Sequence, residues 1–379
     1  MMRYLLPRLL LPVLILLAME VLFRSNLWER VAAPDSHAGT SVRIKQAVAA
    51  ESRPIDFVTL GSSRAEYGLD HARIAALAAR HGKLHANLSM PGAHWMSVMA
   101  QIEWLRSTEP GVQGGIIALS IADLQYVGNG SYELAIVRPF QGMIDDHGNV
   151  RQRFDWHDPS SFGSVSALYE YRGDVRDLLL HPRRRGAALR WFSSFGQHRL
   201  YDGPHQPVDI CAMPWDSLAH CAAHVPTDDN ERHVVSLCQG QVANAGKGGD
   251  WRALDPMALP PDREEVRAQR QSELRSVRWS RPPLVILLPV THHWSRELLP
   301  AGARQWAHTV LDPLVAEGRI ALLDYSDWFD VDGITRCDAF WDIYHQNERG
   351  MRELTEAMLP QIEQHFYADD AADAGTTRR

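Results

Sequence analysis

The sequence lacks an excess of positive charge. Its 379 residues carry 39 Lys and Arg against 46 Asp and Glu, which gives a formal net charge of −7. Proteins that recognise nucleic acid through its phosphates normally present a concentrated basic surface. The one dense basic run, residues 183–185, is typical of a solvated face. We therefore expect no nucleic-acid partner, and the 45% hydrophobic content suffices for a substantial globular core.

Cysteine is also scarce, with four residues in the whole chain: Cys211, Cys221, Cys238 and Cys337. Four cysteines allow three complete pairings, and an oxidising compartment favours one or two disulfides. Histidines at positions 220, 224 and 233 lie among them, which leaves a metal site as an alternative. The spacing matches no standard zinc motif, so we expect no metal and no other cofactor.

Long apolar runs are absent except at the N-terminus. Tyr4–Phe23 spans 20 residues and is broken only by two prolines, an arginine and a glutamate. At a rise of about 1.5 Å per residue it could cross a hydrocarbon core of roughly 30 Å, so residues 1–24 are predicted to be a transmembrane anchor and residues 25–53 a polar stem. A cleaved signal peptide is the alternative, with residues 31–33 as its best cleavage site.

Two arginines precede the centre of this apolar run. The positive-inside tendency then places the N-terminus in the cytoplasm and the main domain outside it. We expect a single-pass protein of the inner membrane whose main domain lies in the periplasm.

Apolar strands alternate with helices over residues 54–366, which indicates an α/β fold with a parallel sheet covered on both faces. The expected helices are 70–80, 94–106, 301–316 and 347–367. The expected strands are Ile55–Leu60, Leu84–Met90, Gly115–Ile121, Leu284–Val290 and Ile320–Tyr325. Residues 129–261 break the alternation and are interpreted as an insertion, and residues 367–379 as a disordered tail.

The motif GSS ends the first expected strand and places Ser63 at the carboxyl edge of the sheet, where open α/β folds usually build their sites. A serine becomes a nucleophile only when a base accepts its proton and a third group orients that base. Asp342 and His345 follow the last strand at a spacing of three and could supply both groups. Asp202 and His205 repeat the spacing, but they lie inside the insertion, with no strand before them.

These motifs, in this order, resemble the SGNH, or GDSL-like, hydrolase superfamily. Gly61-Ser62-Ser63 resembles its first block, with Ser62 at the usual Asp position, and Asn87–Gly92 (NLSMPG) resembles its second. DIYH, ending at His345, resembles its last block. The resemblance implies a three-layer α/β/α domain with a central sheet of about five strands, a catalytic triad of Ser63, His345 and Asp342, and an oxyanion hole that includes the N–H groups of Ser63 and Gly92.

The third block departs from this pattern. The family normally supplies an Asn side chain to the oxyanion hole, whereas LSIADL has Ala122 at that position and Asp123 next to it. A missing oxyanion donor costs about two to three orders of magnitude in turnover. Ser120 and Asn129 are candidate replacements.

The GSSR motif and the N-terminal apolar run resemble the envelope subset of the superfamily, which includes the alginate O-acetylation proteins and the D-alanyl transfer protein of teichoic acid. This resemblance implies an O-acyltransferase, with acetyl as the expected group, that acts on an envelope or exported polysaccharide beside a membrane-bound O-acyltransferase. A periplasmic carbohydrate esterase and an inactive glycan-binding scaffold are the alternatives.

Side chains near the expected site could contact such a substrate. Arg64 follows Ser63 and is either a substrate contact or part of a structural ion pair, and His292 and His293 follow the fourth strand. Aromatic faces also stack well on sugars. The tryptophans of the insertion are Trp156, Trp191, Trp215 and Trp251, for which a core role is the alternative.

Overall fold

The computed structural model describes residues 2–25, 27–34, 36–125, 136–137, 139–140, 166–193, 200–246, 263–299 and 302–376. The chain divides into two compact units. One unit comprises Met1–Ser52 and Asn129–His198, and we call it the N-terminal unit. The other comprises Arg53–Gly128 and Arg199–Arg379, and we call it the sheet unit.

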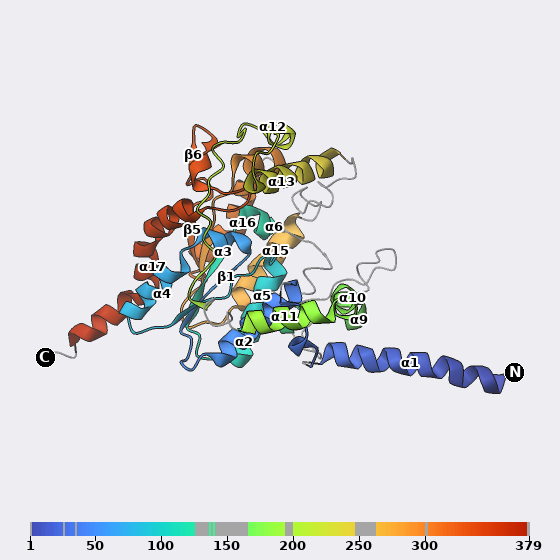
Figure 1. Cartoon of the computed structure of the whole chain (residues 1–379). Helices are drawn as coiled ribbons and strands as arrows, with labels where there is room; N and C mark the ends of the chain where they lie inside the picture. Colours follow the sequence, from blue (N-terminus) through green and yellow to red (C-terminus); the bar gives the residue numbers. More distant parts are fainter. Residues whose placement is uncertain are drawn as a thin grey trace. The chain divides into compact units, whose positions relative to one another are not determined.

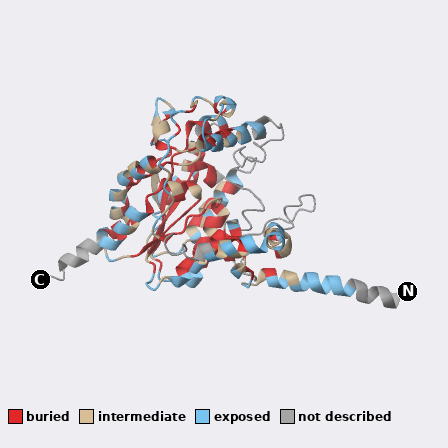
Figure 2. Ribbon diagram, viewed as in Figure 1, coloured by how far each residue is buried: buried red, intermediate tan, exposed pale blue. Residues whose placement is uncertain are grey.

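The sheet unit is built on five parallel strands in the order β2-β1-β3-β4-β5 (Figure 1). The strands are β1 (Phe57–Gly61), β2 (His85–Asn87), β3 (Gly114–Leu119), β4 (Leu284–Leu287) and β5 (Ala321–Asp324). Each strand lies within or next to a stretch predicted from its apolar run, so the prediction of an α/β fold with a central five-stranded parallel sheet is confirmed. Every residue of β1, β3 and β4 is buried, as Figure 2 shows in red.

The strand order reverses beside β1. The chain leaves β1 for β2 on one side and then returns to place β3 on the other side, with Gly61 of β1 opposite Ala118 of β3. Ligands of open α/β sheets bind outside the carboxyl ends of the strands at such a reversal. The residues that follow β1 and β3 therefore occupy the preferred position for a site.

Helices flank the sheet on both sides (Figure 1). Phe57 of β1 packs on Phe366 and Tyr367 of the last helix, with ring centroids 4.8 and 5.4 Å apart. In the described part of the sheet unit, the helices between β1 and β4 are α3 (Ser63–Gly68), α4 (His71–Arg80), α5 (Trp95–Thr108), α6 (Ile121–Gln125), α12 (Leu218–Ala223), α13 (Asp229–Gly246) and α15 (Arg263–Ser276). After β4 come the π-helical turn η5 (His293–Leu298), α16 (Ala303–Ala316), the 3-10 turn η6 (Cys337–Ala339) and α17 (Glu348–Thr376).

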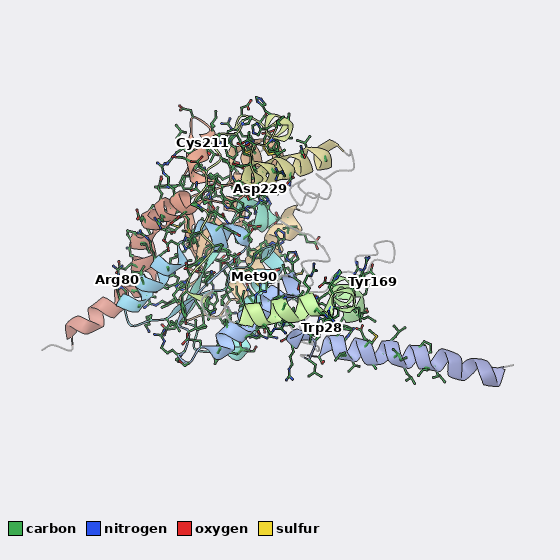
Figure 3. All side chains as sticks on the ribbon, in the orientation of Figure 1. Trp28, Arg80, Met90, Tyr169, Cys211 and Asp229 are labelled. Atoms are coloured by element: carbon green, nitrogen blue, oxygen red, sulfur yellow. A yellow bond between two sulfur atoms is a disulfide. The ribbon has the colours of Figure 1, made fainter. Side chains whose placement is uncertain are left out.

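Two disulfides and a small hairpin complete the sheet unit. Cys211, labelled in Figure 3, is bonded to Cys337, and Cys221 of α12 is bonded to Cys238 of α13. Strands β6 (Asp330–Val331) and β7 (Ile334–Thr335) form an antiparallel pair just before η6. All four cysteines are thus engaged in disulfides.

The predicted insertion, residues 129–261, is divided between the two units. Residues up to His198 group with the N-terminal segment, whereas the part from Arg199 onward groups with the sheet. At the other end, α17 continues through Thr376, although the sequence predicted a disordered tail from residue 367. Alanines at 368, 371, 372 and 374 favour this extension, because alanine has the highest helix propensity.

The N-terminal unit is helical in its described part. Its elements are α1 (Met2–Arg24), the 3-10 turn η1 (Trp28–Arg30), α2 (His37–Ala50), α9 (Ala167–Glu170), α10 (Arg172–Leu180) and α11 (Pro182–Ser193). Glu20 of α1 accepts hydrogen bonds from the backbone N–H groups of Ala167 and Leu168, so it caps the start of α9.

The segment predicted to be a membrane anchor forms helix α1. Across the described residues, however, none of the helices is both long enough and apolar enough to span a membrane.

Candidate active site

Ser63 is the first residue of α3, directly beyond the end of β1. Gly61 ends the strand, and Ser62 is the N-cap of α3, with its Oγ accepting a hydrogen bond from the Arg64 N–H at 3.3 Å. A Cβ on Gly61 would lie inside van der Waals distance of the Ala118 carbonyl oxygen, so the tight strand-to-helix turn requires glycine there. Ser62 is buried, while Ser63 is partly exposed.

The structure brings Ser63, His345 and Asp342 together. The Ser63 Oγ lies 2.8 Å from Nε2 of His345, and Nδ1 of the same ring lies 2.8 Å from Oδ2 of Asp342. A carboxylate can only accept a hydrogen bond, so Nδ1 carries the proton that it donates to Asp342. Nε2 of the neutral ring is then an acceptor for the serine hydroxyl. The three atoms have the arrangement of a nucleophile, its base and the group that orients the base.

Asp342 is buried and ionised. Its Oδ1 accepts hydrogen bonds from the backbone N–H groups of Tyr344 and His345 at 2.6 and 2.8 Å. Burial disfavours the charge, but His345, His233 and the Tyr344 N–H outweigh it and hold the pKa of this carboxyl at about 2. The carboxylate therefore keeps its charge across the whole range in which an imidazole titrates.

The loop that carries Asp342 and His345 is closed on itself and tied to the fold. Phe340 and Gln346 form an antiparallel bridge across it, and the Asn347 side chain donates to the Phe340 carbonyl at 3.3 Å. Thr291, which follows β4, donates to the Ile343 carbonyl at 2.9 Å. These contacts fix the short loop at the carboxyl edge of the sheet, where β1 also ends.

A second buried carboxylate, Asp123, lies next to this triad. Ser120 and Asp123 form a capping box at the start of α6: the Asp123 carboxylate accepts from the Ser120 N–H at 2.9 Å, and the Ser120 Oγ accepts from the Asp123 N–H at 3.2 Å. Asp123 also contacts Arg64 Nη1 at 3.3 Å, His94 Nδ1 at 3.2 Å and Ser62 Oγ at 3.4 Å.

Asp123 is charged in this cluster. Burial opposes the charge, but Arg64, His94 and the Ser120 N–H hold the pKa of the carboxyl well below its usual range. Arg64 is therefore a partner in a buried ion pair and has only 9% of its side chain exposed. Of the two roles that the sequence allowed for Arg64, the structure shows the ion pair.

Gly92, the expected second oxyanion donor, lies in the turn that follows β2. The chain continues along the edge of β1 after the strand ends, because the N–H groups of Leu88 and Met90 donate to the carbonyls of Thr59 and Gly61 at 2.8 and 2.9 Å. Met90 is labelled in Figure 3. Gly92 has a φ of 73°, a left-handed conformation that glycine adopts without strain.

The third block does not supply an amide. Ala122 is buried in the first turn of α6, and Ser120 is committed to the capping box and to Arg64, whose Nη1 lies 3.0 Å from the Ser120 Oγ. Asn129, the other candidate donor, lies outside the described residues.

His292 and His293 are buried away from solvent. The His292 N–H donates to the Thr335 Oγ1 at 2.7 Å, and Nδ1 of His292 accepts from the Thr335 N–H at 3.2 Å. His293 Nδ1 pairs with Glu297 at 3.0 Å. These contacts place both rings in the buried packing near the β6–β7 hairpin, and their role as substrate contacts stays a prediction.

The tryptophans of the insertion are only partly described. Trp215 donates its Nε1–H to the Thr335 carbonyl at 2.7 Å and packs edge-on against His292 and His293, so it belongs to the same cluster. Trp156, Trp251 and the Trp191 side chain lie outside the described residues.

The competing Asp202–His205 pair also forms, with Nε2 of His205 2.9 Å from Oδ1 of Asp202. Both side chains are more than a third exposed. This second pair therefore lies at the surface. Position at the end of a strand, and not the spacing alone, distinguishes Asp342 and His345 from it.

Sequence reasoning missed four side chains around the triad. Tyr67 and Trp341 lie beside the His345 ring, with centroids 5.0 and 5.7 Å away. His233 approaches Asp342, and Gln241 is hydrogen-bonded to the Tyr344 hydroxyl. Trp341 directly precedes the DIYH motif and Tyr344 is its third residue, so both could have been noticed there. Nothing near His233 or Gln241 in the sequence signals their position.

No known protein-family model matches the chain. No curated protein matches it significantly either.

Proposed function

We propose that the chain is a serine enzyme of the SGNH type that transfers an acyl group through a Ser63–His345–Asp342 triad. The observation that carries the proposal is the continuous hydrogen-bonded series from the Ser63 Oγ through His345 to the buried Asp342. The order of the motifs along the chain adds to it, as does their position at the strand reversal beside β1.

In the proposed reaction, the Ser63 Oγ attacks the carbonyl carbon of an acyl ester while Nε2 of His345 takes the hydroxyl proton. Asp342 stabilises the imidazolium that forms, and the N–H groups of Ser63 and Gly92 stabilise the oxyanion. His345 then gives its proton to the departing alcohol, which leaves the acyl group on Ser63. In the second half, an acceptor hydroxyl gives its proton to His345 and attacks the acyl carbon; the bond from that carbon to the Ser63 Oγ breaks, and His345 returns the proton to the serine oxygen.

The acceptor distinguishes transfer from hydrolysis. A sugar hydroxyl gives an acylated glycan, and water gives a free acid, through the same residues. We propose acetyl transfer to an envelope or exported polysaccharide, beside a membrane-bound O-acyltransferase, on the strength of the resemblance to the envelope subset. The two disulfides support a location in an oxidising compartment such as the periplasm. The attachment of residues 1–24 to the inner membrane rests on the sequence alone.

Labelling with a fluorophosphonate probe tests the nucleophile. We expect the full chain to be labelled and Ser63→Ala to be unlabelled. His345→Gln should slow labelling by about 10⁴-fold or more, because serine and base act as one unit. His205→Gln is the matched control, since it removes the histidine of the other Asp-x-x-His pair, and its labelling should match that of the wild type. An unlabelled wild type would contradict the proposal and favour an inactive glycan-binding scaffold.

A partition assay tests the acceptor. The full chain is supplied with 4-nitrophenyl acetate, with and without a mixture of oligosaccharides, and mass spectrometry follows the acetyl group. Transfer predicts acetylated oligosaccharide that disappears in Ser63→Ala. Release of free acetate alone, whatever glycan is added, would identify an esterase.

A further inference from the structure

The triad carboxylate has a second imidazole beside it. Nε2 of His233 lies 3.6 Å from Oδ2 of Asp342, the same oxygen that pairs with Nδ1 of His345. The Asp342 side chain is 1% exposed and that of His233 is 44% exposed. The imidazole of His233 therefore contacts a buried charge and is itself partly exposed to solvent.

The indole of Trp341 stacks against both imidazoles. Its centroid is 5.2 Å from the His233 ring, with an interplanar angle of 11°, and 5.7 Å from the His345 ring, with an angle of 19°. Both imidazoles that contact Asp342 thus also stack on the same indole. This packing restricts the orientation of both imidazoles relative to the carboxylate.

His233 is held in place by a fixed helix. It belongs to α13, whose first residue, Asp229, is labelled in Figure 3. The disulfide between Cys238 of α13 and Cys221 of α12 joins the two helices, and both cysteines are fully buried. Two turns beyond His233, the Gln241 side chain donates to the Tyr344 hydroxyl. Helix α13 is therefore attached to the DIYH loop at two points.

We propose that His233 is a positioning residue for the triad: it contacts the same oxygen of the Asp342 carboxylate as His345 and sets the pH range in which His345 works as a base. This inference rests on the proposed function of Ser63, His345 and Asp342. His233 touches no reacting atom. It acts on His345 only through the carboxylate that the two imidazoles share.

The charge state of His233 decides the strength of this effect. The interaction with Asp342 outweighs partial burial and raises the pKa of His233 above its usual value. Among the described residues, the titratable groups that face His233 are Asp342 and, across the shared carboxylate oxygen, His345, while the Arg64 guanidinium lies 5.8 Å from the ring of Tyr344 in the DIYH loop. Protonated His233 offsets part of the Asp342 charge, which reduces the stabilisation that Asp342 gives to the imidazolium formed at His345 during the reaction.

Two substitutions give opposite expectations. In His233→Gln the cation is lost, and the acid limb of the pH profile of the labelling rate moves up by roughly 0.5 to 1 pH unit, as expected for a charge that contacts the same carboxylate oxygen as His345 in a partly screened site. In His233→Lys a cation is retained at all working pH values, and the acid limb stays at the wild-type position or below it. A merely structural role for His233 would lower the rate in both variants without moving the limb.

The measurement is the rate of fluorophosphonate labelling of Ser63 in the full chain between pH 4.5 and 9, at about pH 0.5 intervals, for wild type and both variants. His220→Gln is the matched control, because this histidine lies on α12 of the same disulfide-linked pair and contacts Asp216 instead. Its limb should coincide with that of the wild type. Coincident limbs in His233→Gln, His233→Lys and wild type would overturn the inference while leaving the nucleophile intact.

A second readout does not require labelling. In Ser63→Ala, the imidazole carbon signals of His233 are followed by NMR over the same pH range. We expect the midpoint of His233 to lie above 6.5, the ordinary value for histidine, and to fall in Ser63→Ala/Asp342→Asn. A midpoint that is the same with Asp342 and with Asn at that position would overturn the inference, even if the wild type carries no label.

Discussion

The buried ion pair between Arg64 and Asp123 should make the charge of Asp123 important for stability. Only 9% of the Arg64 side chain and 1% of the Asp123 side chain are exposed. In Asp123→Asn the side chain keeps its size, but Arg64 loses the negative charge that it faces. Removing one partner of a buried pair costs about 3–5 kcal/mol. For a unit of this size, that corresponds to a fall of about 6–20 °C in the unfolding temperature.

The assay is chemical unfolding followed by circular dichroism, together with calorimetry, on wild type, Asp123→Asn, Arg64→Met and the double variant. Removing both charges should restore part of the stability, with a coupling free energy of about 2 kcal/mol. The reasoning is refuted if Asp123→Asn destabilises by less than about 1 kcal/mol, a value typical of one lost neutral hydrogen bond. It is also refuted if the double variant loses the full sum of the two single changes.

Two further predictions concern pH and the disulfides. Burial lowers the pKa of His71 to about 4, so below pH 6.5 the unfolded chain takes up a proton at this residue while the folded chain does not. The free energy of unfolding should therefore fall by about 3 kcal/mol between pH 6.5 and 4 because of this residue. In unfolding titrations, His71→Gln should make the free energy of unfolding depend less on pH over this range. Replacing Cys211 and Cys337 by serine should destabilise the chain by about 1 to 2 kcal/mol more than replacing Cys221 and Cys238, as measured by chemical unfolding. The reason is that the first disulfide closes a separation of 126 residues and the second a separation of 17. An equal loss of stability in the two variants would contradict this order.

The strands of the sheet could be predicted because a strand buried on both faces is a continuous apolar run. Residues 116–119 and 284–287 are of this kind, and both are fully buried. The second strand is shorter than its apolar run suggested, since only His85–Asn87 has regular pairing. Residues 88–90 still follow the edge of β1, but they turn toward Gly92. An apolar run predicts which residues are buried, but it does not predict where regular strand pairing ends.

The candidate triad could be predicted because each member follows a strand or lies in a short motif at the sheet edge. The role of Arg64 could not be decided, because its partner Asp123 is close only after β1 and β3 pair side by side. The burial of His292 could not be predicted, because the hairpin residue that contacts it, Thr335, comes some forty residues later in the chain. His233 depends on the packing of α13, which no local pattern predicts.

The absence of an amide at residue 122 leads to a gain-of-function prediction. Asp123 cannot replace the missing donor, because an ionised carboxylate only accepts hydrogen bonds and repels an oxyanion. The N–H groups of Ser63 and Gly92 are then the donors that the proposed mechanism can use. In Ala122→Asn, we expect the labelling rate of Ser63 to rise by about tenfold or more. This is less than the two to three orders of magnitude that a native oxyanion-hole donor contributes to turnover.

Ala122→Leu is the control for that substitution, since leucine has nearly the same shape as asparagine and no N–H group to donate. Its labelling rate should stay at or below that of the wild type. Thermal unfolding of both variants checks that the buried position accepts the larger side chain. Equal rates in Ala122→Asn and Ala122→Leu, with both variants folded, would mean that residue 122 does not face the oxyanion. The correspondence with the third block of the superfamily would then be wrong at this residue.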